Sequence, residues 1–561
     1  MISIQREIQS KYPTLDQKSI IGFLKKIIHE DKINDFLVEN AHLMGFEFVD
    51  AILEYFNFDF TLLQNQIQNI PTHGGVIIIA NHPLGALDGL MLLKIIGNIR
   101  KDVKIVANDF LTQFNQLDSL LLKVNNFNSF QTKDDIKAIH DELKSGHAVI
   151  IFPSGEVSRA RINGIKDTKW YKGFLTFAIT TKSPILPIHI KAKNSWLFYT
   201  VSAINKRIST LLLSNEMFNQ RDKKVNVTIG ELIPYESIPT NIKKKELIIL
   251  FKKHLYGLCK SKTILQTQKA IAHPENRQLI LEELKGATVL GNTSDGKKIY
   301  LYSYEADSTI LKELGRLREL SFRKVGEGAN KRRDTDKYDK YYDHIILWDE
   351  KDLEIVGSYR IGNSNHIMAA YGEDGFYTST LFDFSPSFHG YLKDSIELGR
   401  SFVQPKYWGT RALDYLWYGI GAYLKNHRNI KYMFGVVSLS GNYPPIAKDL
   451  IVNYYKHYFQ DSNELLKPLN PYVYSNNIDE INALFGYEDR QSDFKILKLA
   501  LNDVGFAVPT LFKQYSELCN DGGVKFLGFN IDTSFSNCVD GFILVDISTI
   551  KTPQKNRYIN N

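Results

Sequence analysis

Several features that define whole classes of protein are scarce or missing in this chain of 561 residues. Three cysteines, at 259, 519 and 538, are too few and too scattered for a disulfide framework or a zinc cage, so we expect a reducing compartment. Only 17 prolines and a hydrophobic fraction of 43% exclude a disordered or collagen-like chain. No run of about 18 apolar residues occurs, which predicts no membrane-spanning helix, and the first residues lack the apolar core of a secretory signal.

Charge of one sign is also in short supply. The net charge of +7 is mild for this length, so it permits an anionic partner without identifying one, and we expect no nucleic acid. The 14 histidines are dispersed, which predicts no metal site. At about 100–200 residues per domain, the chain has room for about two to four domains.

The first half alternates short apolar runs with helical segments. We expect strands and helices alternating through this region, with strands at 76–80, 103–107, 148–152, 185–190 and 225–230 and helices at 86–97, 133–144, 172–182 and 243–258. This alternation predicts an α/β domain with a largely parallel sheet.

Residues 1–70 are predicted to be helical. The apolar residues of one segment recur at helical spacing between lysines: Ile20, Phe23, Leu24, Ile27 and Ile28. Such a basic amphipathic helix either packs on its own domain or lies on an anionic membrane surface.

The second half has an α+β pattern. We expect strands at 299–303, 344–349, 354–361 and 432–438, and helices at 308–322, from about 391, at 410–426 and at 445–458. The mixed polar stretch between the halves predicts domains at 1–260 and 291–561, joined by a linker at 261–290.

A histidine follows directly on the strand expected at 76–80, in the segment 81–89 (NHPLGALDG). Open α/β sheets place their ligands at the carboxyl ends of strands. Asp88 lies about one turn into the next helix, where its carboxylate can fix the tautomer of His82 and leave the other ring nitrogen as a general base. Because no Ser or Cys nucleophile stands beside His82, we expect it to activate a hydroxyl of the substrate. The alternative is a histidine bonded to backbone at a turn.

A second strand end, at 153–159 (PSGEVSR), adds polar and cationic groups to the same sheet. With the histidine segment it resembles the glycerolipid acyltransferases, which have the lysophosphatidic-acid-acyltransferase-like fold, over about residues 70–235. Five residues separate His82 from Asp88, as in the hemolysin-like branch. The resemblance implies acyl transfer from a thioester to a hydroxyl, and it implies substrate binding by Asn81, Gly85, Pro153, Ser154, Gly155, Ser158 and Arg159.

The second motif departs from the family pattern. The arginine that would hold a glycerol phosphate is displaced, and Arg159 is the nearest replacement. Because a phosphate dianion favours a bidentate cation, we expect an acceptor with a carboxylate or without phosphate.

The second half carries its own series of charged and aromatic residues: Arg318, Phe322, Asp336, Asp339, Arg360, Glu397 and Arg400. An Arg/Glu pair alone is usually a solvated ion pair. In this order the series resembles the acyl-homoserine-lactone synthases and the ornithine N-acyltransferases, a GNAT-like branch, over about residues 295–460. A family tryptophan after the phenylalanine is missing, since 325–328 reads VGEG.

The resemblance implies roles for these residues. Amide formation needs a free amine, so a base must deprotonate the ammonium, and Glu397 is the candidate. The arginines would hold carboxylates or position the acidic residues. Asp336 and Asp339 would bind the acceptor ammonium or orient the arginines. The segment 432–438 would be the second strand of a splayed pair that binds pantetheine.

Two such halves on one chain resemble the bifunctional ornithine lipid synthases. The resemblance implies that the second half N-acylates an amino acid, with ornithine favoured, using a 3-hydroxyacyl group, and that the first half then O-acylates the new hydroxyl. Acyl carrier protein or coenzyme A would bring the thioester as a substrate, with no tightly bound cofactor. We expect a cytoplasmic enzyme, peripheral on the inner face of a bacterial membrane. Its basic runs at 243–245, 252–253 and 331–333 either attract carrier protein or are ordinary solvated faces.

Other interpretations stay open. The chain can instead be a lysophospholipid (1-acylglycerol-3-phosphate) acyltransferase with a regulatory C-terminal domain, or an N-acyltransferase acting on glycine or another amino acid. A membrane-associated binding protein without activity is the third reading. The helix at 246–258, with apolar residues on one side, would either dock a domain or touch lipid.

Overall fold

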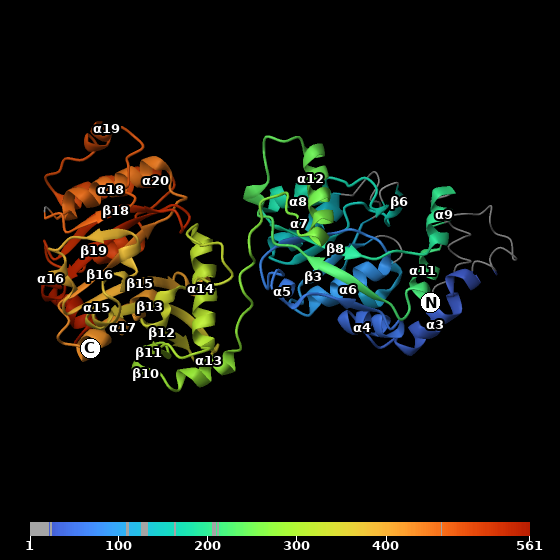
Figure 1. Cartoon of the computed structure of the whole chain (residues 1–561), viewed down its shortest axis with the longest axis horizontal. Helices are drawn as coiled ribbons and strands as arrows, with labels where there is room; N and C mark the ends of the chain where they lie inside the picture. The colour runs from blue at the N-terminus through green and yellow to red at the C-terminus, as the bar shows by residue number, and fades with distance from the viewer. Residues whose placement is uncertain are drawn as a thin grey trace. The chain divides into compact units, whose positions relative to one another are not determined.

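The structure is a computed structural model that describes residues 22, 25–107, 111–124, 133–161, 164–204, 209, 212–461 and 463–560. The chain divides into two compact units, Met1–His273 and Pro274–Asn561 (Figure 1). The division falls inside 261–290, and one helix from that stretch, α13 (Arg277–Leu284), belongs to the second unit.

The first unit is built on one seven-stranded sheet in the order β1-β9-β8-β2-β5-β3-β4. Its strands are β1 (Asp59–Thr61), β2 (Val76–Ala80), β3 (Val103–Ala107), β4 (Leu121–Lys123), β5 (Ala148–Ile151), β8 (Ile185–Lys191) and β9 (Lys224–Ile229). Only β8 and β9 pair antiparallel. The prediction of an α/β domain with a largely parallel sheet is therefore confirmed.

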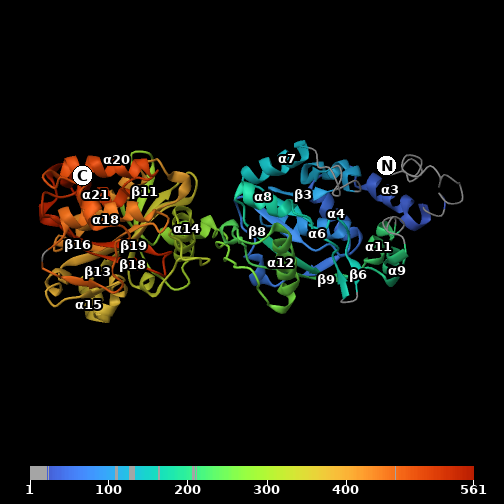
Figure 2. The ribbon, with the colours of Figure 1, turned by 90° about the horizontal axis from the view of Figure 1, so that it is seen from above.

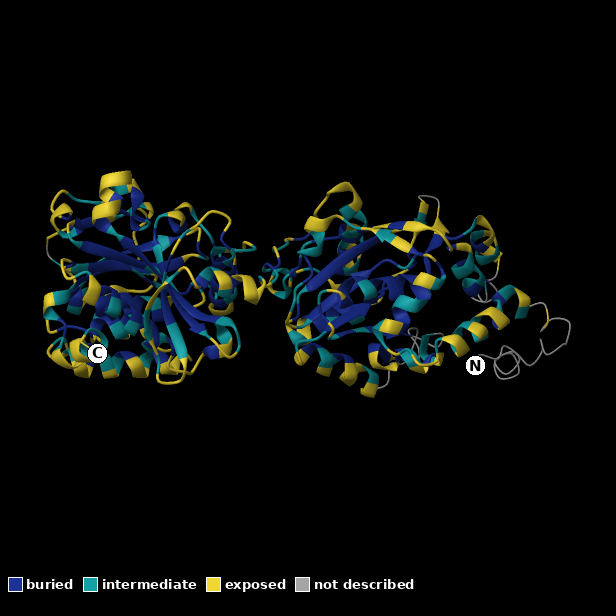
Figure 3. Cartoon of the chain, turned by 90° about the horizontal axis from the view of Figure 1, so that it is seen from below, coloured by how far each residue is buried: buried dark blue, intermediate teal, exposed yellow. Residues whose placement is uncertain are grey.

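Helices cover both faces of this sheet. They are α3 (Glu30–Glu39), α4 (Phe46–Tyr55), α5 (Gln64–Ile67), α6 (Ala86–Gly97), α7 (Lys133–Lys144), α8 (Gly173–Thr181), α9 (Trp196–Ile204), α11 (Leu213–Asn219) and α12 (Lys244–Gly257). Alternate residues of β2 pack against different helices: Ile78 lies in the core with α4 and α6, and Ile77 in the core with α7, α8 and α12. Burial on both faces explains why β2 is apolar throughout, and the sheet is dark in Figure 3.

The N-terminal region predicted to be helical differs in part from the structure. The predicted amphipathic helix near the N-terminus is described only in part: Ile20, Phe23 and Leu24 lie outside the described residues, while Ile28 is buried. Within the region predicted to be helical, Asp59–Thr61 instead forms strand β1, paired with β9.

The helix at 246–258 does not offer its apolar side to lipid. Leu247, Phe251 and Leu255 of α12 are buried in the core of the first unit, so the lipid-touching interpretation is wrong for this helix. Lys252 on the same helix points at protein, donating to the carbonyl oxygens of Asp167 and Thr168 at 2.7 and 2.6 Å.

The second unit contains an eight-stranded sheet in the order β10-β11-β12-β13-β15-β16-β19-β18. Its strands are β10 (Thr288–Asn292), β11 (Lys297–Ser303), β12 (Asp343–Asp349), β13 (Glu354–Asn363), β15 (Ser395–Val403), β16 (Tyr432–Leu439), β18 (Val524–Asp532) and β19 (Cys538–Asp546), and β14 (Phe382–Phe384) pairs separately with β17 (Leu466–Pro468). All neighbours in the large sheet are antiparallel except β15 and β16.

Helices pack on both sides of this sheet as well (Figure 2). Besides α13 they are α14 (Thr309–Val325), α15 (Ser364–Tyr371), α16 (His389–Leu392), α17 (Ala412–Asn426), α18 (Pro445–Phe459), α19 (Ile478–Asn482), α20 (Arg490–Asp503), α21 (Thr510–Ser516) and α22 (Thr552–Tyr558). Residues of α17 and α18 share the largest core with the sheet, and residues of α14 lie in a separate core. The predicted α+β character is confirmed.

The helix predicted from about residue 391 is wrong. The helix α16 ends at Leu392, and residues from Ser395 onwards form β15 at the centre of the sheet. The sequence there alternates, with Ile396 and Leu398 apolar between polar residues, which is the period of a strand rather than a helix.

Among the described residues, no helix has both the length and the apolar character needed to span a bilayer.

Candidate active sites

The first site lies where β2 ends. The Nδ1 atom of His82 is 3.0 Å from Oδ2 of Asp88, which also accepts hydrogen bonds from the backbone N–H groups of Leu84 and Gly85 at 2.7 and 3.1 Å. Gly85 has a φ of 87°, in the left-handed region that favours glycine, and this turn starts helix α6 with Asp88 in its first turn. The carboxylate of Asp88 therefore both caps the start of α6 and contacts the imidazole of His82.

The two members of this pair differ in exposure. The side chain of Asp88 is fully buried, whereas that of His82 is 17% exposed. Burial raises the pKa of Asp88, opposed by its hydrogen bond and attraction to His82. The imidazole stacks on Phe152, with ring centroids 3.9 Å apart. A carboxylate on Nδ1 leaves Nε2 as the ring atom available to a substrate hydroxyl.

The second motif is held against the first. The backbone N–H of Ser158 donates to the carbonyl oxygen of His82 at 2.7 Å. Asp167, which sequence reasoning missed, accepts from both segments: from the N–H of His82 at 3.1 Å and from Oγ of Ser158 at 2.5 Å. Its other oxygen accepts from Nε1 of Trp170. No motif marks Asp167, because its partners lie up to 85 residues away along the chain.

Four of the other residues expected to bind substrate bond to backbone or form a turn. Asn81 bonds through both its amide oxygen and its amide nitrogen to the backbone of Ile190, so it joins strands β2 and β8. Pro153, Ser154 and Gly155 form the turn after β5, where the Oγ of Ser154 donates to the carbonyl of Glu156 at 2.7 Å. Gly155 has a φ of 62°.

Arg159 turns away from His82 toward a helix. Its Nη1 donates to the hydroxyls of Ser202 on α9 and Ser209 at 2.5 and 2.7 Å, and its guanidinium lies over the ring of Phe198. Burial lowers the pKa of Arg159. Its Nε atom has no hydrogen-bond partner among the described residues.

An apolar pocket adjoins the helix that carries Asp88. Its wall includes Ala86 and Leu90 of α6, together with side chains from α4, α11 and the segment 111–117, among them Phe48, Ile52, Phe114, Leu117 and Phe218. The lining is almost entirely hydrocarbon. Such a pocket suits an acyl chain rather than a polar substrate.

The second unit contains a buried network of charges. Nη1 of Arg318 lies 2.7 Å from Oδ1 of Asp339, and Nη1 of Arg360 lies 3.0 Å from the same oxygen and 2.6 Å from Oδ1 of Asp336. Burial raises the pKa of Asp339, but Arg318 and Arg360 outweigh it, so the net pKa is well below the usual range. The two aspartates therefore face the arginines, and Arg318 and Arg360 are themselves buried.

Arg400 joins this network from β15. Its guanidinium lies 3.5 Å from the carboxylates of both Asp334 and Asp336, and it packs over the rings of Tyr377 and Phe535. Arg400 has a φ of 48°, and the register between β13 and β15 shifts at this point. This bulge changes the direction of the Arg400 side chain, so that Arg400 and Glu397, three residues apart in the strand, both contact Tyr377.

Glu397 is the second of those residues. Its carboxylate accepts from the hydroxyl of Tyr342, from the N–H of Tyr377 at 3.1 Å and from the N–H of Thr378 at 2.7 Å. Burial raises the pKa of Glu397, opposed by these donors and by Arg360. A buried carboxylate with a raised pKa can hold a proton taken from an amine.

Three residues at this site were not predicted from the sequence. Tyr342, Tyr377 and Thr378 carry no motif, and they are 19 to 55 residues from Glu397 in sequence. Phe322 is a core residue of α14 that packs edge-to-face on Phe535.

Two further acids, Asp540 and Glu327, have raised pKa values, and Asp540 interacts electrostatically with Arg400. Burial raises the pKa of Asp540 to about 7, and it is hydrogen-bonded to Oγ of Ser438 at 2.6 Å. Burial and the charge of Asp540 raise the pKa of Glu327 to about 8.

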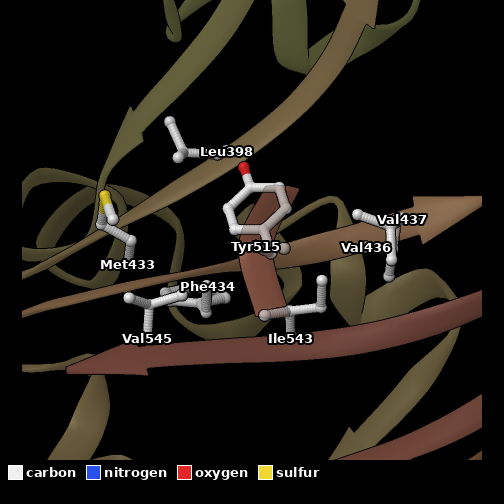
Figure 4. A pocket seen from close by; sticks show the side chains of 9 residues that line it. Leu398, Met433, Phe434, Val436, Val437, Tyr515, Ile543 and Val545 are labelled. Atoms are coloured by element: carbon white, nitrogen blue, oxygen red, sulfur yellow. The ribbon is translucent and has the colours of Figure 1, made fainter. Parts of the chain in front are cut away.

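Strands β15 and β16 separate within the sheet. They pair in parallel from Ser395 and Tyr432 as far as Leu398 and Gly435, and beyond that point β15 follows β13 while β16 follows β19. A Cβ atom on Gly435 would lie 2.1 Å from the carbonyl oxygen of Leu398, so glycine is required at the divergence. Side chains of β16, β19 and Tyr515 line a small pocket there (Figure 4). A splayed pair of this kind leaves backbone N–H groups free for a ligand.

The described residues do not form a metal centre, since no group of three or more His, Cys, Asp and Glu side chains within them is placed to hold an ion.

Comparisons with known proteins find acyltransferase families in both units. The family described as "Acyltransferase" matches residues 8–264, and the family described as "Acetyltransferase (GNAT) domain" matches residues 317–418. The glycine N(alpha)-acyltransferase of Bacteroides thetaiotaomicron is 32% identical over 303 residues, which is 52% of this chain and 89% of that protein.

Two further relatives each match less than half of this chain. The lyso-glycine lipid O-acyltransferase of the same organism is 32% identical over 247 residues, 42% of this chain and 90% of that protein. The L-ornithine N(alpha)-acyltransferase of Brucella abortus is 29% identical over 255 residues, 43% of this chain and 79% of that protein.

Proposed function

The chain belongs to the acyltransferases, with an acyltransferase unit followed by a GNAT unit, and on that basis we propose that it builds an aminolipid by two successive acyl transfers. The second unit N-acylates an amino acid with a 3-hydroxyacyl group, and the first unit O-acylates the hydroxyl so introduced. The observation that carries the proposal is the presence on one chain of His82 bonded to buried Asp88 and of buried Glu397 among tyrosines.

The N-acyl transfer begins with the amino acid as an ammonium ion. Glu397 takes its proton, the free amine attacks the thioester carbonyl, the C–N bond forms, and the C–S bond breaks to release the thiol. The raised pKa of Glu397 suits a group that must accept a proton and pass it on. The pantetheine arm lies in the opening between β15 and β16, and Arg400 attracts the carboxylate of the acceptor.

The O-acyl transfer uses the lyso-lipid as the nucleophile. Nε2 of His82 removes the proton from the 3-hydroxyl as the oxygen attacks a second thioester, and Asp88 stabilises the imidazolium until the departing thiolate is protonated. The acyl chain enters the apolar pocket beside α6. The displaced Arg159 agrees with an acceptor that carries a carboxylate and no phosphate.

We propose glycine as the amino acid, in place of the ornithine that the sequence favoured, because the glycine-specific relative matches more of this chain at higher identity. Ornithine is the second candidate, and Asp540 and Glu327 favour it, because a second ammonium group beside them would pair with their ionised forms. The donor is carrier protein, and the enzyme works at the inner face of the bacterial membrane, in the cytoplasm.

The proposal is tested with purified protein, 3-hydroxyacyl carrier protein, and glycine and ornithine in equal amounts. Mass spectrometry should show a monoacyl amino acid first and a diacyl product after a second acyl donor is added. The ratio of glycine to ornithine products decides the head group.

Variants separate the two steps. We expect His82→Ala to stop only the second step and Glu397→Gln only the first, while His140→Ala and Glu282→Gln, at exposed or half-exposed positions, serve as controls and change neither. The proposal fails if no amino acid or lyso-lipid is acylated, or if both site variants lose the same step.

A further inference from the structure

Helix α9 (Trp196–Ile204) carries an apolar stripe on its outer side. Five residues are exposed at positions 196, 197, 200, 203 and 204, a spacing that puts them on one face of a helix. Trp196 is 76% exposed, Leu197 47% and Ile204 84%. No other large apolar side chain among the described residues is as exposed as Ile204. Large apolar groups gathered in this way mark an interaction surface.

The inward side of α9 is fixed, so the helix cannot simply turn its stripe into the core. Phe198 is fully buried, and the hydroxyl of Tyr199 accepts from the backbone N–H of Asn194 at 3.0 Å. Ser202 accepts from Arg159, and buried Glu216 of α11 holds both the N–H and the hydroxyl of Ser195 just before the helix. The stripe is therefore a permanent outer face of the first unit.

Charges around the stripe favour an anionic partner. Residues 191–204 contain Lys191 and Lys193, both exposed, and no acidic residue. Strands β6 (Arg159–Arg161) and β7 (Gly164–Lys166) pair antiparallel beside α9 and add exposed Arg161 and Lys166. Among the acids near this face, Glu216 is buried and Glu156 lies 3.7 Å from Arg159. Tryptophan and isoleucine beside lysines and arginines are the composition of a helix lying in the interface of an anionic bilayer.

We propose that the α9 stripe inserts into the surface of an anionic lipid bilayer and positions the first unit to take its acceptor from that bilayer. The inference rests on the proposed function, in which the acceptor is a lyso-lipid. The stripe connects to the site on its inner side: Nδ2 of Asn194, two residues before the helix, donates to the carbonyl of Pro83 at 3.0 Å, next to His82. Arg159 joins the same helix to the second motif. A lipid held at α9 thus lies beside the residues proposed to acylate it.

The test compares the full chain with the variant Trp196→Glu/Ile204→Glu. Vesicles of phosphatidylethanolamine are prepared with and without phosphatidylglycerol, and bound protein is measured by flotation. We expect the double variant to partition at least about tenfold less onto anionic vesicles. Leu63→Glu, at a residue 61% exposed elsewhere in the first unit, is the matched control and should change binding by less than about twofold. Brominated lipid should quench wild-type fluorescence more than that of Trp196→Phe.

Activity gives an independent readout. The double variant should lose O-acylation of a lyso-lipid embedded in vesicles, and it should keep O-acylation of a short-chain acceptor dissolved as monomers. Vesicle binding by the double variant equal to wild type overturns the proposal, and so does α9-dependent binding of acyl carrier protein without binding of vesicles. If wild type binds vesicles through α9 but acylates no acceptor, the surface is supported and the proposed function fails.

Discussion

Replacing Asp88 by asparagine tests the first site with the least change in shape. Asparagine keeps the size of the side chain, and its single oxygen can still accept from the N–H groups of Leu84 and Gly85 that now bond to Oδ2 of Asp88. Since these capping contacts can be kept, the substitution should lower the free energy of unfolding by about 1 kcal/mol at most. What the variant loses is the negative charge 3.0 Å from Nδ1 of His82.

The size of the catalytic effect follows from that distance. At that distance a carboxylate stabilises an imidazolium by about 5 kcal/mol at an effective dielectric constant of about 20. Since about 1.4 kcal/mol corresponds to a tenfold change in rate, the O-acylation rate should fall by about 10²–10⁴-fold.

The assay uses synthetic N-(3-hydroxyacyl)glycine and labelled acyl donor, with the initial rate of diacyl lipid as the readout. N-acylation by the same preparation reports on the second unit and should be unchanged. Asp134→Asn makes the same replacement at an exposed residue in the first turn of α7, and it should leave O-acylation intact. A folded Asp88→Asn protein that O-acylates within about threefold of wild type would refute the reasoning.

Two further predictions concern the second unit. Gly435→Ala places a Cβ atom 2.1 Å from the carbonyl oxygen of Leu398, so it should lower the free energy of unfolding by about 2–4 kcal/mol and raise KM for the acyl donor. Gly399→Ala meets no atom within 4 Å and should be nearly neutral in the same denaturation and kinetic assays; equal behaviour of the two would contradict the close-approach argument. Asp540→Asn tests a carboxyl whose pKa is raised by burial from 3.8 to about 7, so the folded state disfavours the charge and stability falls as pH rises through that range. By calorimetry the variant should unfold about 2–6 °C higher than wild type at pH 8 and at the same temperature at pH 4, and no difference at pH 8 would count against a buried, charged Asp540.

Much of the fold could be predicted because buried segments have a recognisable pattern of apolar residues. The run 76–80 is apolar at every position because helices cover both faces of β2, and such runs located the central strands of the first unit. The histidine at the end of that strand, with an acid one turn later, indicated a functional pair that the structure brings to hydrogen-bonding distance.

The failures come from contacts between distant segments. Glu397 and Arg400 fall within the helix expected from about residue 391, but the segment is strand β15, where a register shift at Arg400 lets both residues contact Tyr377. Asp167 and Tyr342 reach the sites across 85 and 55 residues, and no local pattern records such pairs. The surface helix α9 was also not predicted, because its outer apolar face does not pack against a core.

The shared oxygen of Asp339 has a consequence for how sequences of this kind can diverge. Arg318 and Arg360 both bond to that one buried atom, and neither guanidinium is open to water. Losing Asp339 leaves the buried guanidinium of Arg318 without the carboxylate that it bonds to, at a cost of about 3–5 kcal/mol, which is a large part of the stability of a typical domain. Related chains should therefore keep the trio unchanged or replace its members together, so that the three positions co-vary while neighbouring core positions drift independently.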